Sequence, residues 1–412
     1  MRKVFKFLEE PPDGLQVIAP TTFELPEEAS VYAPFGPERI EALNKLSRAI
    51  LTTPSLRGDD ASTAFAFWLR PGYVGEVHRH YDAMCERYPD AVVQPAGLVF
   101  HIAPGNVDTM FLYSWALSFL CGNQNAIRIS GRSGGLLADL LGCMNTLMEQ
   151  HPWIAAENIF CQYPREAADI TQFFSEQCDL RVVWGGNETI RRIRNISLNP
   201  HASERCFSSK YSLAILKVEA FLAADAGERQ QVFEKLYNDI YPFDQMACSS
   251  PHAICWVGNE AERTKAIPLF QDGFRTVLEA KGHQDSAGAA VKRYSHAFEM
   301  AAENRGRVAL ENAGCLHVDC TRNELVRDLC GGGFLSHYAM GDLTELAGQL
   351  SPRDQTIVHY GFKPAELKAF AQSELHRGID RMVPLGASLN FHHIWDGFDL
   401  LRDFSRLLHL SS

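Results

Sequence analysis

The feature that most constrains the fold is an alternation of short apolar segments and helical segments that begins near residue 97. Residues 97–102 are typical of a strand, residues 103–106 of a turn, residues 107–120 of a helix, and residues 125–130 of the next strand. Strand, helix and strand within about 35 residues form a βαβ unit, and this connection joins parallel strands. The sequence therefore predicts a parallel sheet.

The same alternation recurs along the chain, which indicates an open α/β architecture. The further expected elements are helix 38–51, helix 133–150, strand 157–162, helix 165–178, strand 181–184, a helix through residue 193, strand 213–218, helix 227–238, strand 254–257, helix 264–281, and strands 314–318, 335–340 and 355–360. Open α/β sheets bind ligands at the carboxyl ends of their strands, so we expect a site in the turns that follow the strands.

Length and charge limit the class of protein. A chain of 412 residues exceeds one simple core, so two domains are expected. The net charge of -11 argues against nucleic acid or an anionic membrane as the main partner. The longest apolar stretch, residues 110–121, is too short to span a bilayer, and the N-terminus lacks a signal-peptide core. The eleven scattered cysteines without a CxxC pair fit a reducing compartment, so a cytoplasmic protein is expected.

One cysteine has a distinctive setting. Residues 241–251 carry an apolar and amide run that leads to Cys248, followed by Ser249, Ser250 and Pro251. A thiol becomes a nucleophile only where nearby dipoles or cations favour its thiolate. The alternative is a small buried hydrophobic residue, since free cysteine is among the most buried residue types.

Two turns after predicted strands are candidates for binding. Gly185, Gly186 and Asn187 lie between a strand and a helix, where a backbone can approach a phosphate, although an ordinary βα turn is equally consistent with them. In the turn 103–106, Asn106 can donate amide hydrogens to a developing oxyanion, or it can cap the following helix.

Two arginines follow the second predicted strand. Arg128 and Arg132 flank Ser130, and no acidic residue occurs between positions 126 and 137. A carboxylate in such a place holds the ribose of NAD, whereas cations accommodate the extra phosphate of NADPH. The alternative is two solvated surface arginines. The run 315–320 contains cysteine, histidine and aspartate, but an alternating strand explains it better than a metal site, and no metal is expected.

Several longer runs together resemble one known family. Residues 101–109, 113–115 and 121–123 (HIAPGNVDT, YSW, CGN), residues 245–251 (QMACSSP), and residues 381–386 and 394–397 (RMVPLG, IWDG) resemble the LuxC-type acyl-CoA reductases, in the same order from about residue 95 onward. That family is similar to the aldehyde dehydrogenase superfamily. The resemblance implies two Rossmann-like open parallel-sheet domains with a bridging or oligomerising segment.

The resemblance also implies domain limits. They are an N-terminal segment packing on the cofactor domain over 1–90, a cofactor domain over 91–238, a catalytic domain over 239–385, and a C-terminal segment over 386–412 that returns to the cofactor domain or to an interface.

Residue roles follow from the same resemblance. Cys248 falls at the nucleophile and Asn106 at the oxyanion amide. The implied NADPH-binding residues are Ala103, Pro104, Arg128, Ser130, Arg132, Gly185, Gly186 and Asn187. Two positions depart from the superfamily. The general-base glutamate falls at Cys206, and the carboxylate that grips the nicotinamide ribose is missing near residues 330–333.

The missing base favours acyl reduction over hydrolysis of an acyl-enzyme by water. We therefore expect NADPH-dependent reduction of an acyl-CoA or an acyl-protein thioester to the aldehyde through Cys248. The alternatives are an aldehyde dehydrogenase, an acyl-phosphate reductase, and a subunit that transfers acyl groups without redox chemistry. The resemblance implies a homo-oligomer and an acyl-CoA, acyl-carrier or acyl-protein synthetase partner.

Overall fold

The computed structural model describes residues 11–21, 32–103, 109–129, 135–283, 285–312, 314–322, 324–373 and 378–411. The chain divides into two compact units. Unit 1 comprises residues 1–208 and 391–412, and unit 2 comprises residues 209–390. Within the described residues, no helix has the length and apolar character needed to cross a membrane.

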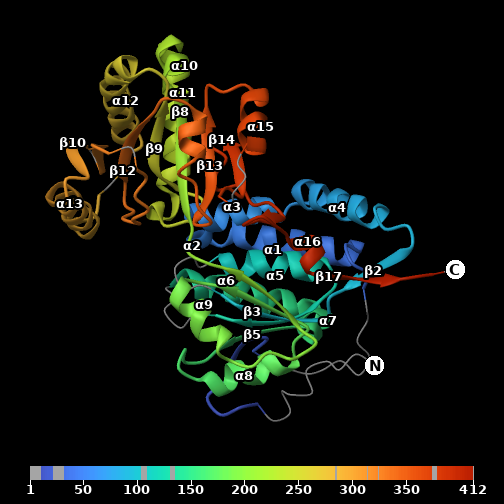
Figure 1. Ribbon diagram of the computed structural model, residues 1–412. Helices are drawn as coiled ribbons and strands as arrows, with labels where there is room; N and C mark the ends of the chain where they lie inside the picture. The colour runs from blue at the N-terminus through green and yellow to red at the C-terminus, as the bar shows by residue number, and fades with distance from the viewer. Residues whose placement is uncertain are drawn as a thin grey trace. The chain divides into compact units, whose positions relative to one another are not determined.

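Unit 1 is built on a six-stranded sheet in the order β1-β5-β4-β3-β6-β7, in which only β1 runs antiparallel to its neighbour (Figure 1). The strands are β1 (Gln16–Ala19), β3 (Leu98–Ile102), β4 (Gln124–Arg128), β5 (Asn158–Gln162), β6 (Leu180–Trp184) and β7 (Ser203–Phe207). From β3 the chain first moves outward to β4 and β5, and then returns to the other side of β3 with β6 and β7. The crevice of a dinucleotide-binding sheet lies at such a reversal, here between β3 and β6.

Unit 1 also contains ten helices among the described residues, four of which precede β2 in the sequence. They are α1 (Pro37–Thr52), α2 (Pro54–Arg57), α3 (Asp60–Trp68), α4 (Pro71–Glu86), α5 (Met110–Leu120), α6 (Gly135–Gln150), α7 (Pro152–Glu157), α8 (Ala168–Gln177), α9 (Asn187–Arg194) and α16 (Leu400–Asp403). Every residue of α5 after Met110 is buried, so the most apolar stretch of the sequence is a core helix. The expected helices 38–51, 133–150 and 165–178 are confirmed as α1, α6 and α8.

The C-terminal residues join unit 1. The short pair β15 (Ile394–Trp395) and β16 (Phe398–Asp399) precedes α16, and β17 (Ser405–His409) pairs antiparallel with β2 (Ala91–Pro95). In Figure 1 the β2–β17 ribbon projects from the unit and leads to the C-terminus.

Unit 2 contains a seven-stranded sheet in the order β10-β11-β12-β9-β8-β13-β14, parallel except for β10. Its strands are β8 (Tyr211–Lys217), β9 (Pro251–Val257), β10 (Gly306–Asn312), β11 (Cys315–Cys320), β12 (Phe334–Met340), β13 (Asp354–Tyr360) and β14 (Arg381–Pro384). Its helices are α10 (Val218–Ala223), α11 (Ala226–Ile240), α12 (Glu260–Ala280), α13 (Ala287–Ala302), α14 (Leu343–Ala347) and α15 (Pro364–Ser373). Two apolar clusters fill the unit, and strands β8, β9 and β12 contribute to both.

The division between the units lies earlier than the expected limit at 238/239. The strand predicted at 213–218 exists as β8, but it pairs with β9 and β13 and not with the first sheet. Helices α10 and α11 follow it into unit 2. Sequence periodicity identifies a strand but does not indicate which neighbours it pairs with.

Candidate active site

Exposure separates Cys248 from most of the other cysteines. Eight of the eleven thiols are buried, and Cys85, Cys206 and Cys248 are partly exposed. Burial raises the pKa of the Cys85 thiol and raises that of Cys206 to about 11, so both favour the protonated form. Because the thiolate is the nucleophile, these two sites are poor ones for covalent chemistry. Cys248 remains the candidate.

Cys248 lies in the turn that precedes β9, at the amino ends of β8, β9 and β13. This differs from our expectation that sites lie where strands end. The Gly185 turn follows β6, and its role as a site stays a prediction, whereas Cys248 lies at the opposite ends of the strands in unit 2. A turn that precedes a strand can present a side chain at the edge of the sheet, just as a turn that follows a strand can.

Four hydrogen bonds form a closed ring around Cys248. The Gln355 side-chain amide donates from Nε2 to Cys248 Sγ over 3.3 Å, and its Oε1 accepts from the Thr356 hydroxyl over 3.2 Å. The backbone N–H of Thr356 donates to Ser212 Oγ over 3.2 Å, and that hydroxyl donates to the Cys248 carbonyl over 2.6 Å. The ring therefore fixes both the backbone and the sulfur of Cys248.

Two irregularities in the sheet bring these residues together. In β13, Gln355 and Thr356 both lie opposite Ser212, since Asp354 pairs with Tyr211 and Ile357 with Leu213. In β9, His252 is an extra residue between Pro251 and Ala253, which pair with the consecutive residues Ser212 and Leu213. Bulges redirect side chains at the ends of strands. The bulge in β13 places Gln355, which is 2% exposed, against the thiol.

The turn that carries Cys248 is held by the buried side chain of Gln245. Its Nε2 donates to the carbonyls of Pro251 (2.8 Å) and Phe334 (3.0 Å), and its Oε1 accepts from the backbone N–H groups of Gly333 (2.9 Å) and Phe334 (3.1 Å). One amide therefore joins the start of β9 to the start of β12. Phe243, Asp244 and Gln245 all have positive φ, at 61°, 52° and 63°, which non-glycine residues rarely adopt.

The glycine run 331–333 faces this turn. Its backbone is also left-handed, with φ of 77°, 61° and 83°, and Gly332 N donates to Asp244 O over 2.9 Å. A Cβ at Gly333 would lie 2.3 Å from the carbonyl oxygen of Gly314, and one at Gly331 would lie 2.6 Å from Met246 Sδ. The glycine run, where the sequence lacks the expected carboxylate, thus packs against the turn that carries Cys248.

Three features of this site were missed from the sequence, namely Gln245, Gln355 and Ser212. A sequence signal existed only for Gln245, which belongs to the run that resembles the nucleophile segment. Gln355 and Ser212 lie far from Cys248 along the chain, and only strand pairing brings them close.

The predicted cofactor residues lie in unit 1 and are described only in part. Pro104, Asn106, Ser130 and Arg132 lie outside the described residues, so their roles stay predictions. Ala103 is buried at the end of β3, and its N–H donates to the Arg128 carbonyl.

Arg128 ends β4, and its side chain is engaged with Tyr163. Nη2 donates to the Tyr163 carbonyl over 3.3 Å, and the guanidinium lies 4.9 Å from the centre of the Tyr163 ring. The residue is 9% exposed, so the alternative of a solvated surface arginine is wrong for Arg128.

Gly185, Gly186 and Asn187 form the turn between β6 and α9. Gly185 N donates to Phe207 O, and a Cβ at Gly185 would lie 3.2 Å from Thr189. Gly186 and Asn187 are exposed, and in the described part of the chain no side chain caps the first turn of α9. Exposed N–H groups at a helix start can bind a phosphate.

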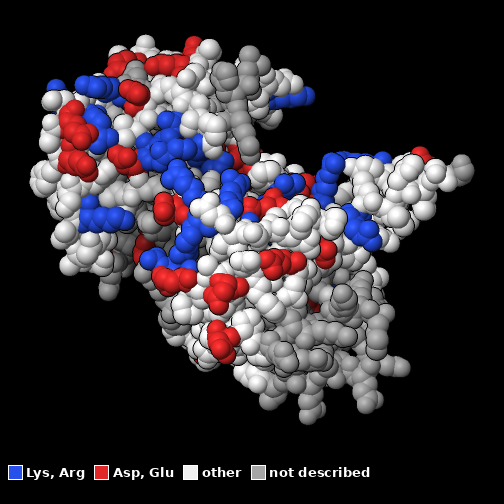
Figure 2. Space-filling view, turned by 60° about the horizontal axis from the view of Figure 1, so that its bottom comes forward, with Lys and Arg blue, Asp and Glu red and all other residues white. Residues whose placement is uncertain are grey.

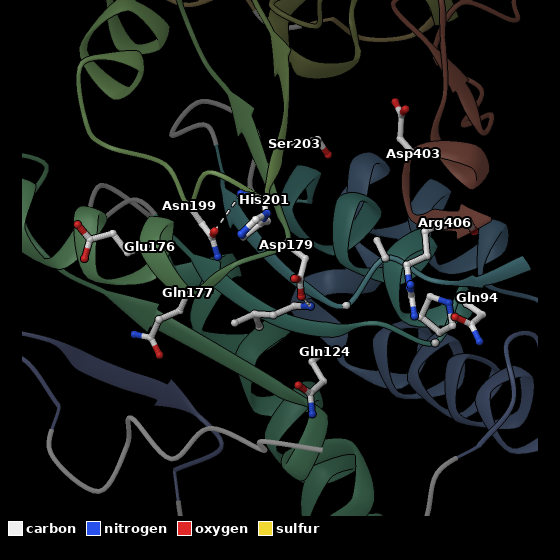
Figure 3. A pocket seen from close by; sticks show the side chains of 16 residues that line it. Gln94, Gln124, Glu176, Gln177, Asp179, Asn199, His201, Ser203, Asp403 and Arg406 are labelled. Carbon is white, nitrogen blue, oxygen red and sulfur yellow. Dashed lines mark hydrogen bonds between the residues drawn. The ribbon is translucent and has the colours of Figure 1, made fainter. Parts of the chain in front are cut away.

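A polar hollow of about 1060 Å³ lies elsewhere in unit 1 (Figure 3). Gly97, Gln124, Asp179 and Ser203 line it at the amino ends of β3, β4, β6 and β7, and Arg406 of β17 also contributes. It therefore opens at the sheet edge opposite to Ala103 and Gly185. Its position does not match the crevice that a dinucleotide occupies in such sheets.

Three histidines form the one group in the described residues with nitrogen atoms close enough for a metal ion. His80 of α4 and His392 and His393 of the C-terminal segment have ring nitrogens within 4.8 Å of one another. However, Nδ1 of His392 accepts from the N–H of Ile394, so a neutral ring carries its proton on Nε2. The His392 and His393 rings stack at 4.4 Å, and burial lowers the pKa of His393 to about 3. The cluster packs the C-terminal segment against α4.

Comparison with known proteins supports the fold and the resemblance. Residues 77–267 match the family described as acyl-CoA reductase (LuxC). No match was found among curated proteins. The resemblance to LuxC-type acyl-CoA reductases is thereby confirmed over those residues.

Solved structures of aldehyde dehydrogenases are similar to the chain over nearly its whole length. Methylmalonate-semialdehyde dehydrogenase from Oceanimonas doudoroffii has a TM-score of 0.67 and 12% identity, and the match covers 96% of this chain and 90% of that one. A putative aldehyde dehydrogenase from Burkholderia cenocepacia has a TM-score of 0.64, 14% identity and coverages of 90% and 84%. A lactaldehyde dehydrogenase has a TM-score of 0.64, 13% identity and coverages of 91% and 87%. The aldehyde-dehydrogenase-like α/β fold is confirmed.

Proposed function

We propose that this LuxC-type chain reduces an activated acyl group, presented as an acyl-CoA or an acyl-protein thioester, to the aldehyde through a thioester on Cys248. The observation that carries the proposal is the setting of Cys248, a partly exposed thiol on a turn held by the hydrogen bonds of Gln245, with an amide donor 3.3 Å from its sulfur. The match of residues 77–267 to acyl-CoA reductases supports the same chemistry.

The first step uses only the chain and the acyl donor. The Cys248 thiolate attacks the acyl carbonyl carbon, the bond from that carbon to the donor sulfur breaks, and the donor leaves as a thiolate that takes up a proton. Splitting a difficult displacement into two steps is the usual advantage of a covalent nucleophile. A preorganised donor for the transient oxyanion is worth several kcal/mol, and Asn106 is the proposed donor.

The second step distinguishes reduction from hydrolysis. An aldehyde dehydrogenase needs a base to activate water on the acyl-enzyme. The position that corresponds to this base is occupied by Cys206, whose thiol is protonated at neutral pH because burial, and secondly Glu204, raises its pKa to about 11. A protonated thiol cannot accept a proton from water, so the thioester is preserved for reduction.

The residues of unit 1 fit a nicotinamide dinucleotide. The strand order places a topological reversal between β3 and β6, and the exposed Gly186–Asn187 turn offers the uncapped start of α9 beside it. Gly185, Gly186 and Asn187 would hold the diphosphate, with Ala103, Pro104, Arg128, Ser130 and Arg132 as the other proposed contacts. When bound, NADPH would supply the hydride that converts the thioester into the aldehyde and returns Cys248 as a thiolate.

We also propose that the protein is a homo-oligomer in which a second copy covers the β2–β17 ribbon. Val92, Leu407, Leu408 and Leu410 are 43–54% exposed on this ribbon. Leu407 and Leu408 are consecutive, so both faces of the ribbon carry uncovered apolar side chains. A two-stranded sheet is marginally stable by itself, and coverage by another subunit would stabilise it.

The test is acyl-dependent oxidation of NADPH by the wild-type chain and by Cys248→Ser. Loss of turnover with retained NADPH binding supports the proposal, and full turnover of the variant contradicts it. Rapid formation of free acid from an aldehyde and NADP, without CoA, would favour an aldehyde dehydrogenase. Stable acylation of Cys248 that NADPH cannot discharge would favour a subunit that only transfers acyl groups. An acyl-CoA is the simplest first substrate to assay. Figure 2 shows that basic and acidic side chains lie beside one another on one face of the molecule.

A further inference from the structure

The Gln355 side chain contacts the sulfur of the proposed nucleophile. It is buried at 2% exposure on the bulge of β13, and its Nε2 lies 3.3 Å from Cys248 Sγ. A buried amide is costly to keep at the edge of an active site unless its hydrogen bonds are made. Gln355 lies in the bulge of β13, and a bulge directs a side chain differently from a regular strand.

The orientation of the amide follows from the ring of hydrogen bonds. The Thr356 hydroxyl donates to Gln355 Oε1, which leaves Nε2 to point at the sulfur. Ser212 in turn ties the Thr356 N–H to the Cys248 carbonyl. Any shift of the nucleophile turn would therefore disturb the amide, and any shift of β13 would move the thiol.

The charged groups on the neighbouring strands already have partners. Arg327 pairs with Asp354, next to Gln355 in β13, and Lys210, before β8, pairs with Asp380, before β14. His252 in the β9 bulge is neutral at pH 7, because burial lowers its pKa to about 4. The Gln355 amide is a neutral N–H donor that is directed at the sulfur.

We propose that Gln355 is a catalytic residue that stabilises the Cys248 thiolate by donating a hydrogen bond from Nε2 to Sγ. The inference deepens the proposed function, because it concerns the nucleophile of that reaction. As the thiol loses its proton to solvent, the donor meets a full negative charge, and hydrogen bonds to charged groups are about twice as strong as neutral ones. Thr356 and Ser212 act through Gln355 and the turn, so they are positioning residues.

The test measures the thiolate directly and does not require turnover. The rate of alkylation of Cys248 by iodoacetamide is followed against pH by mass spectrometry of the peptide that contains it, which separates it from the other ten cysteines. In Gln355→Leu, which keeps the volume and removes the donor, we expect the midpoint of the alkylation profile to rise by about one pH unit and the rate at pH 7 to fall about tenfold. Gln355→Glu should raise the midpoint further, since a carboxylate repels the thiolate.

Two further variants keep the test decisive. Thr356→Val retains Gln355 and removes only the hydroxyl that orients it, so a smaller upward shift is expected even if Gln355→Leu does not fold. Gln349→Leu is the matched control, because Gln349 Nε2 contacts the sulfur of Met340 and not that of Cys248. Its alkylation midpoint should match that of the wild type.

The outcomes for the two proposals are distinct. An unchanged or lowered midpoint in folded Gln355→Leu or Gln355→Glu overturns the role of Gln355 whatever the reaction is, and an unchanged midpoint in Thr356→Val overturns the positioning role of Thr356. A raised midpoint supports it, even if the wild-type chain fails to oxidise NADPH with any acyl-CoA. A raised midpoint without NADPH oxidation by the wild-type chain would contradict the proposed function and not the role of Gln355.

Discussion

The side-chain oxygen of Gln245 accepts a hydrogen bond from the backbone N–H of Gly333 over 2.9 Å, and this contact joins the turn that carries Cys248 to the start of β12. The same amide also binds Pro251 and Phe334, so a single side chain satisfies several buried backbone groups. The position of Cys248 therefore depends on the hydrogen bonds of this neutral side chain.

Replacing Gln245 by leucine should lower the free energy of unfolding of unit 2 by about 2–4 kcal/mol, because buried backbone donors and acceptors lose their partner. Urea unfolding followed by circular dichroism measures this loss. Gln230→Leu serves as the control, since Gln230 makes an exposed contact with Glu234 on α11 and its loss should change stability by less than about 0.5 kcal/mol. Equal stabilities of the two variants would contradict the stabilising role of the Gln245 side chain.

A methyl group at Gly333 should destabilise unit 2 by about 2 kcal/mol or more. The backbone there has φ of 83°, and the added Cβ would lie 2.3 Å from the carbonyl oxygen of Gly314. Gly288→Ala in α13 should instead raise the free energy of unfolding by up to about 0.5 kcal/mol, because no atom lies within 4 Å of its Cβ position and alanine favours the helix. The comparison requires only melting curves of the two variants. A neutral Gly333→Ala would show that the glycine run is not needed for the turn.

Acid should destabilise the protein through its buried histidines. His101 donates from Nε2 to Asn125, accepts from Ser114 at Nδ1 and is fully buried, and burial lowers its pKa to about 4. Burial also lowers the pKa of His337 to about 3. The unfolded chain takes up these protons near pH 6.5 and the folded chain does not, so stability is complete above about pH 6.5 and is lost as the pH falls toward 4.

The variant His101→Gln checks this reasoning. Below pH 6.5 each such histidine lowers the free energy of unfolding by up to about 1.4 kcal/mol per pH unit. The free energy of unfolding of the variant should therefore fall less steeply between pH 6 and pH 4.5. Urea unfolding over that range gives the slopes. A decline as steep as in the wild type would mean that His101 does not contribute.

Cys206 should be dispensable for acyl reduction. Its thiol is protonated at neutral pH, and the proposed reaction needs no base at that position. We expect Cys206→Ser to keep NADPH oxidation within about twofold of the wild type, which corresponds to less than about 0.5 kcal/mol in the barrier. A loss comparable to that of Cys248→Ser would assign Cys206 a role that the account lacks.

The β2–β17 ribbon should carry the contact between subunits. Leu408→Glu places a charge on its exposed apolar surface and should shift the protein toward the monomer in size-exclusion chromatography with light scattering. Leu269→Glu on α12 is the control, since Leu269 is similarly exposed but lies on a helix of unit 2. A monomeric wild type, or an unaffected Leu408→Glu oligomer, would contradict this assignment.

The sequence predicted the elements of both sheets better than their pairing. Strands such as β3, β4 and β6 follow from apolar runs between turns, and α5 follows from its unbroken apolar stretch. The segment 203–207 was not predicted as a strand, because Glu204 and Arg205 interrupt its apolar character. It exists because β6 offers it a parallel partner.

The candidate active site was predictable only where one short segment contains it. Local pattern and family resemblance point to Cys248 and to the run that contains Gln245, but they assign no role to the Gln245 side chain. Gln355 lies opposite Ser212 because β13 pairs with β8 with a bulge, and a register of that kind leaves no local trace in a sequence. The bulge in β9, the glycine run and the hydrogen-bond ring depend on the same long-range pairing.

In the proposed reaction, an acyl group resides on the sulfur of Cys248 between the donor and the aldehyde. The most direct measurement incubates the protein with an acyl-CoA in the absence of NADPH and identifies the modified peptide by mass spectrometry. We expect acylation of Cys248, no acylation in Cys248→Ser, and loss of the modification with release of the aldehyde when NADPH is added. Aldehyde formation that proceeds with Cys248 unmodified, or unimpaired in Cys248→Ser, would contradict it.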